Sequence, residues 1–126
     1  MEDQSIATYR ALVHQIITKV SVPQLRACVG TGAGVDAAHM PSCRTAVLDQ
    51  GAGDEAALSL LAAATVPPRF AALNSSLHDA IVLNLADDHK TLAAIDSGDP
   101  AMMAAFEEQD NTYSDKLAPL IAKIDQ

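Results

Sequence analysis

The sequence predicts an all-α fold, and three observations lead to this expectation. Apolar residues make up 49% of the 126-residue chain, whereas aromatic residues account for only 3% and tryptophan is absent. Many of the apolar residues are alanine, which favours helices and is depleted in strands. Apolar residues recur at helical spacing in several segments, and no segment shows the alternation typical of a strand. We therefore expect an antiparallel helical bundle that forms a single domain over residues 1–126.

Three long helices are expected, near residues 5–22, 68–96 and 100–125. The first has an apolar stripe that includes Tyr9, Val13 and Ile16, and Pro23 follows it. The second begins at a pair of prolines, and the third carries an apolar stripe to the end of the chain.

The segment "SGDP", residues 97–100, separates the last two helices. Gly98 is a typical residue just past a helix end, Asp99 a typical N-cap, and Pro100 fits the first helical turn. Such a short connection would make these two helices antiparallel neighbours.

The middle of the chain, between residues 23 and 65, is expected to form short helices. Glycines at positions 30, 32 and 34 interrupt regular structure. Beyond them, "PSCRTAVLDQ" and "GAGDEAALSLLAAATVPP" each predict a short helix, with Asp54 as the cap of the second.

The charge of the chain argues against several classes of partner. The net charge is −8 and the isoelectric point is about 4.6, which opposes binding to nucleic acid or to an anionic membrane surface. No apolar run reaches the length of a membrane span. The first residues, "MEDQSIATYR", have acidic flanks and no apolar segment, so we expect no signal peptide there. Both a cytoplasmic protein and the mature part of an exported one fit these residues.

The only two cysteines, Cys28 and Cys43, bracket a glycine-rich loop. A disulfide would close this loop and would stabilise the fold by roughly 3 kcal/mol in the chain-entropy estimate. Disulfides persist in oxidising compartments, so this pairing would place the protein outside the cytoplasm. Two buried free thiols in a cytoplasmic protein are the alternative.

Two other interpretations of the loop have less support. Cys28, His39, Met40 and Cys43 are ligand types that suit Cu(I) or Zn²⁺, but they lack the close paired spacing of a structural zinc site. The glycines do not follow a predicted strand and no Gly-Lys-Ser/Thr closes them, as a phosphate-binding loop requires.

Two polar residues fall on the apolar stripe of the helix near 68–96. Counting about 100° per residue from Phe70 places Asp88 near the centre of the stripe and Asn84 beside it. Residues four apart on a helix are neighbours, and buried polar groups need hydrogen-bond partners. Gln109 and Tyr113 on the last helix are the expected partners. The four residues predict a polar layer that sets the helix register, a bundle splayed open so that water reaches them, or a polar pocket for a small ligand.

The chain resembles uncharacterised small secreted proteins and lipoproteins of actinobacteria and related high-GC bacteria. The similarity rests on Cys28, on Cys43-Arg44 with Ala46, and on the segments "TVPPRFAALNSSLHDAI" and "AAIDSGDP". It covers residues 28–100. The resemblance implies a short helical domain outside the cytoplasm, and it implies no activity.

These observations favour a non-enzymatic extracytoplasmic domain that binds a partner protein or a small ligand, without a cofactor. No Gly-x-Ser-x-Gly segment or other catalytic motif is present. The alternative is a metal or small-molecule carrier with a polar pocket inside the bundle. The residues leave the oligomeric state open.

Overall fold

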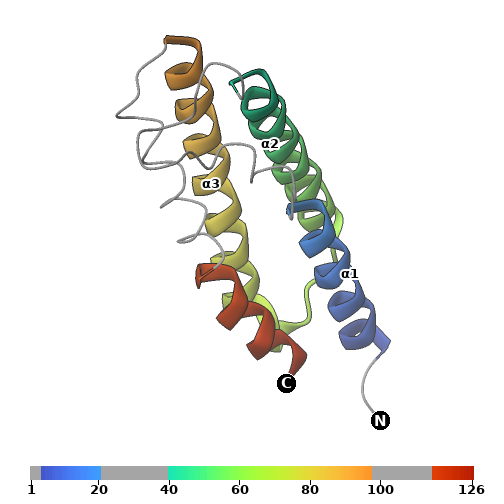
Figure 1. Cartoon of the computed structure of the whole chain (residues 1–126). Helices are drawn as coiled ribbons and strands as arrows, with labels where there is room; N and C mark the ends of the chain where they lie inside the picture. The colour runs from blue at the N-terminus through green and yellow to red at the C-terminus, as the bar shows by residue number, and fades with distance from the viewer. Residues whose placement is uncertain (1–3, 21–39, 98–114) are drawn as a thin grey trace.

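The computed structural model describes residues 4–20, 40–97 and 115–126, and within these ranges it contains helices and short connecting segments but no strand. The elements in order are α1 (Gln4–Val20), α2 (Met40–Ala63), the short 3₁₀ helix η2 (Pro68–Phe70) and α3 (Ala71–Ser97), followed by a final helix over residues 115–125. The expected all-α bundle is therefore confirmed (Figure 1).

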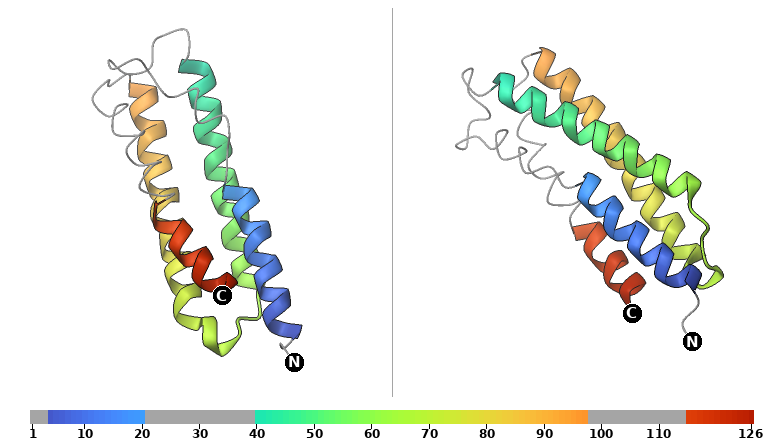
Figure 2. Two further views of the ribbon diagram at one scale, coloured as in Figure 1. Left: turned by 60° about the horizontal axis from the view of Figure 1, so that its bottom comes forward. Right: turned by 90° about the vertical axis from the view of Figure 1, so that its right-hand side faces the viewer.

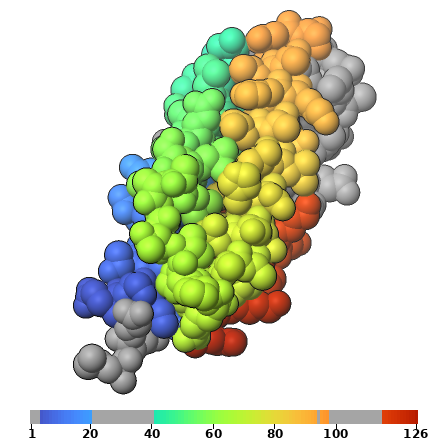
Figure 3. All heavy atoms as spheres, turned by 180° about the vertical axis from the view of Figure 1, so that it is seen from behind, coloured from blue at the N-terminus to red at the C-terminus, as the bar shows by residue number. Residues whose placement is uncertain are grey.

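The helices alternate in direction around a long central pair. α2 and α3 run antiparallel along the whole length of the molecule, and α1 packs on α2 (Figures 1 and 2). α1 and the final helix flank the half of this pair that contains the end of α2 and the start of α3. Seen from behind, α2 and α3 form most of the surface, with α1 at one side and the final helix at the other (Figure 3).

The apolar core lies where the four helices meet. The Tyr9 ring of α1 stacks on the Phe70 ring, with centroids 5.4 Å apart. Each large side chain buried in this way stabilises the fold by about 1.5–3 kcal/mol. The cluster comprises Tyr9, Val13, Ile16, Val20, Ala57, Leu61, Phe70, Leu77, Ile81, Leu117 and Ile124.

The final helix is held at its end by basic side chains from other elements. Arg10 Nε of α1 donates a 2.8 Å hydrogen bond to the carbonyl oxygen of Ile124, and Arg69 of η2 reaches the carbonyl of Gln126 at 3.4 Å. The last carbonyls of a helix have no partner within it, so these contacts cap the helix. The Arg10 and Arg69 guanidinium groups also lie 5.7 and 4.7 Å from the centroid of the Phe70 ring.

The second long helix begins as predicted near residue 68, with one 3₁₀ turn before α3. Of the helix expected at 100–125, the structure describes residues 115–125. The expected turn at 97–100 lies outside the described residues apart from Ser97, the last residue of α3.

The prediction of short helices between residues 23 and 65 is wrong over residues 40–63, which form the single 24-residue helix α2. Gly51 and Gly53 lie inside it, and Asp54, expected as a cap, is a buried mid-helix residue. A glycine within a helix costs about 0.5–1 kcal/mol relative to alanine. Gly53 has a packing reason, because a Cβ at this position would overlap the carbonyl oxygen of Lys19 at the end of α1. Residues 23–39 lie outside the described part of the chain.

The two glycines of α2 give a matched pair of variants. Gly53→Ala should lower the free energy of unfolding by about 2 kcal/mol, because the new methyl group would push α1 away from α2. Gly51→Ala places its Cβ 3.8 Å from Leu85 Cδ1, an ordinary contact, and should raise stability by up to about 1 kcal/mol through helix propensity. Urea unfolding of both variants measures the difference. Equal effects would contradict the close contact between α1 and α2.

Candidate functional site

A group of buried polar side chains lies between α2 and α3, next to the apolar core. We call it the polar cluster, and its members are Gln50, Asp54, Asn84, Asp88 and Thr91. Asp54 is 0% exposed and Asp88 2%. Burying carboxylates is costly unless they are hydrogen-bonded, so the contacts within this cluster matter for the fold.

One amide links the two helices in the polar cluster. Asn84 Nδ2 donates to Asp54 Oδ2 at 2.8 Å and lies 3.5 Å from Asp88 Oδ2. The first contact joins α3 to α2, and the second joins neighbouring turns of α3. The nitrogen atom of Asn84 thus lies within hydrogen-bond distance of the carboxylates of both Asp54 and Asp88.

Gln50 extends the polar cluster to α1. Its Nε2 donates to the carbonyl oxygen of Val20, the last residue of α1, at 3.0 Å and to Asp54 Oδ1 at 3.2 Å. Its Oε1 is buried and has no hydrogen-bond partner among the described residues. An unsatisfied buried acceptor costs about 1–3 kcal/mol. The two hydrogen bonds made by the amide nitrogen of Gln50 offset part of this cost.

The structure brings two of the four predicted polar residues together. Asn84 and Asp88 are buried side by side on α3, and Asn84 also bonds Asp54 on α2. The expected partners, Gln109 and Tyr113, lie outside the described residues. Sequence reasoning missed Gln50 and Asp54 because it ended a helix between them. Their spacing of four continues the stripe formed by Val47, Ala57 and Leu61, which would have revealed them in a single helix.

Cys43 lies in the first turns of α2 and is completely buried. Its expected partner, Cys28, lies outside the described residues, and so does His39. Met40 is the first residue of α2. The disulfide and the alternative metal site therefore remain predictions. Elsewhere in the described ranges, no three His, Cys, Asp or Glu residues lie close enough together to hold a metal ion.

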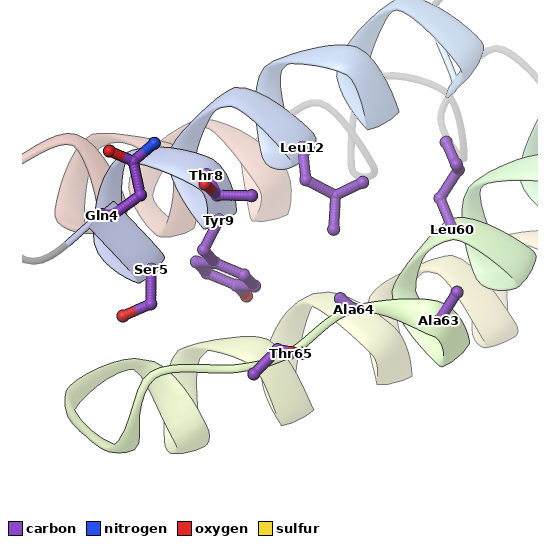
Figure 4. A pocket seen from close by; sticks show the side chains of 9 residues that line it. All are labelled: Gln4, Ser5, Thr8, Tyr9, Leu12, Leu60, Ala63, Ala64 and Thr65. Atoms are coloured by element: carbon purple, nitrogen blue, oxygen red, sulfur yellow. The ribbon is translucent and has the colours of Figure 1, made fainter.

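A pocket of about 510 Å³ opens between the first half of α1 and the end of α2 (Figure 4). We call it the α1–α2 pocket. Its apolar lining comes from Tyr9, Leu12, Leu60, Ala63 and Ala64. Its polar lining comes from Gln4, Ser5, Thr8 and Thr65, so none of the nine described lining residues carries a charge.

Tyr9 connects the α1–α2 pocket to the apolar core. Its hydroxyl donates a 2.6 Å hydrogen bond to Asn74 Oδ1 on α3, while its ring lines the pocket. Burial raises the pKa of Tyr9 above its ordinary value of 10. Tyr9 therefore stays neutral at physiological pH, and no described lining residue titrates near neutrality.

Sequence patterns gave no signal for this pocket. Its walls are a stretch of α1 and the segment from Leu60 to Thr65, and neither forms a motif. The hollow depends on the distance between two helices, which sequence periodicity does not report.

The fold and the α1–α2 pocket together define a helical-bundle protein with an uncharged cavity on its side. Comparison of the chain with protein-family models, curated proteins and solved structures finds no match. Among the described residues, no helix has the length and apolar character needed to cross a membrane.

A double-mutant cycle tests the link between α2 and α3. Asp54→Ala, Asn84→Ala and the double variant should give a coupling energy of about 1.5–3 kcal/mol, the range for hydrogen bonds to charged groups. The cycle separates this pair from the other contacts that each residue makes. Chemical unfolding gives the four free energies.

The exposed pair His78 and Asp79, 3.2 Å apart on α3, provides the control. The same cycle there should give at most about 1 kcal/mol. A coupling energy for Asp54 and Asn84 no larger than the control would contradict a structural role for their hydrogen bond.

Proposed function

We propose that this chain is a non-enzymatic, extracytoplasmic helical domain that binds a small ligand in the α1–α2 pocket. The observation that carries the proposal is the pocket itself, a concave site of about 510 Å³ lined by five apolar and four polar residues. Binding sites for small molecules fall in the range of about 300–1,000 Å³ and combine apolar walls with a few polar groups.

The chemistry of the lining supports binding over catalysis. Proton transfer needs a group whose pKa lies near the working pH. The described lining offers hydroxyl and amide groups, and the Tyr9 hydroxyl is already engaged with Asn74. Such groups orient a ligand through hydrogen bonds and leave its covalent structure unchanged.

The proposed location outside the cytoplasm rests on the cysteines and on the resemblance to small secreted helical proteins. The chain has two cysteines, and no free cysteine is found among the described residues. Burial of Cys43 in α2 would anchor a disulfide to the central helix pair. The loop before α2 would then be tied to the bundle.

A second candidate function, a carrier with a polar site inside the bundle, is favoured by one observation. Gln50 Oε1 is a buried acceptor that has no partner in the described part of the chain, and it belongs to the same side chain that bonds Asp54. A ligand with a hydrogen-bond donor would satisfy it. Gln50→Leu would abolish binding at that site and leave binding in the α1–α2 pocket unchanged.

Binding in the α1–α2 pocket can be tested with N-phenyl-1-naphthylamine, an uncharged dye whose fluorescence rises in apolar surroundings. We expect a Kd on the order of 1–100 μM for a ligand of this size. Ala63→Phe places a ring at the pocket and should weaken binding by about tenfold or more, because it occupies the space of the dye.

Ala62→Phe is the matched control, since Ala62 is the preceding exposed residue of α2 and does not line the pocket. Binding in this variant should equal that of the unaltered protein. Equal loss in both variants, or no effect of either, would contradict the site.

The disulfide has its own test. Thiol labelling of the unreduced, denatured protein should modify no cysteine, and labelling after reduction should modify both. Reduction should also lower the melting temperature, because an open loop adds conformational entropy to the unfolded chain. Labelling of two cysteines before reduction would contradict both the disulfide and the main support for a location outside the cytoplasm.

A further inference from the structure

We propose that the ligand of the α1–α2 pocket is a neutral amphipathic molecule, with an apolar body and one or two hydroxyl or carbonyl groups. The inference rests on the proposed function and adds the chemical class of the ligand. It follows from the charge, the size and the arrangement of the lining.

The first argument is charge. None of the described lining residues is charged, and a charged ligand group buried there would lack a partner from among them, which is costly. Arg10 follows Tyr9 in sequence, but its guanidinium lies over the Phe70 ring and bonds the carbonyl of Ile124. The net charge of −8 further disfavours an anion approaching the protein.

The second argument is size. A volume of about 510 Å³ corresponds to roughly 17 water molecules at about 30 Å³ each in the liquid. By the same scale the pocket suits a ligand of on the order of 15–20 non-hydrogen atoms. A folded protein domain does not enter a hollow of this size, although a single side chain would.

The third argument is the placement of polar and apolar groups along the pocket. Gln4, Ser5 and Thr8 lie on the first turns of α1, and Leu12 and Leu60 lie at the other end (Figure 4). Hydroxyl and amide groups both donate and accept hydrogen bonds. The N-terminal end of a helix also carries a partial positive charge, which favours an oxygen atom of the ligand there. The ligand should therefore place its polar group near Gln4 and its apolar body against Leu12 and Leu60.

Two related dyes separate charge from shape. N-Phenyl-1-naphthylamine is neutral, and 8-anilinonaphthalene-1-sulfonate has the same ring system with a sulfonate added. We expect the neutral dye to bind at least about tenfold more tightly, since only the anion must bury a charge. Competition with a neutral terpenoid alcohol should displace the neutral dye.

Two lysine variants test whether the selectivity belongs to the pocket. Thr8→Lys adds a cation at an exposed position of the lining and should tighten binding of the sulfonate by about fivefold, because a close charge pair in water contributes about 1 kcal/mol. Ala7→Lys adds the same charge on the neighbouring exposed position of α1 outside the lining. It should change the affinity for the sulfonate by less than about twofold at physiological salt.

The outcomes distinguish a failure of the proposed binding function from a failure of the proposed ligand class. If neither dye binds, or if Ala63→Phe leaves binding unchanged, the proposed function fails and this inference fails with it. If the neutral dye binds in the pocket but the sulfonate binds as tightly or more tightly, the proposed function stands and the inference about the ligand is wrong. The ligand would then be an anion whose charged group lies at the start of α1. Equal tightening by Thr8→Lys and Ala7→Lys would show that net charge, and not the pocket, sets the selectivity.

Discussion

The hydrogen bond between Asn84 and Asp54 sets the alignment on which the rest of the bundle depends. It joins α3 to α2 near the middle of both helices, where a shift of one turn would leave the buried carboxylate of Asp54 without this donor. Apolar side chains tolerate such a shift more easily, because their contacts are not directional. Gln50 also fixes the position of α1, because its amide nitrogen donates to both Asp54 and the carbonyl oxygen of Val20. Three helices are thus placed relative to one another by three polar side chains.

The interior has two parts, one packed mainly with large apolar side chains and one that also contains hydrogen-bonded polar side chains. Where α1 and the final helix flank the central pair, the core is built from large apolar residues around Tyr9 and Phe70. Further along the central pair, small or polar side chains such as Cys43, Ala46, Asp88 and Thr91 are buried together with Val47 and Ile95. The apolar half supplies most of the favourable burial, and the polar half supplies directional bonds that select one arrangement.

The α1–α2 pocket follows from the way these two helices approach each other. At one end, Gly53 allows the backbone of α1 to lie directly against α2. At the other end, Ala63 and Ala64 face the first turns of α1 with side chains too small to fill the space. Tyr9 closes the inner side, because its hydroxyl is bound by Asn74 and its ring by Phe70. Close contact at one end and small side chains at the other leave an uncharged hollow that is open to solvent.

The sequence by itself determined the all-α class, the start of α1, the start of the helix near 68 and the burial of Asn84 and Asp88. Helical periodicity can be predicted in this way because it is a local property of the chain. The sequence did not reveal that α2 is continuous, since two glycines and an aspartate are local signals for a break, and only contact with α1 and α3 outweighs them. The partners of Asn84 and the pocket were also decided by tertiary structure. Both depend on which residues of separate helices meet and on the distance between those helices. Packing between segments far apart in the chain sets these contacts and distances.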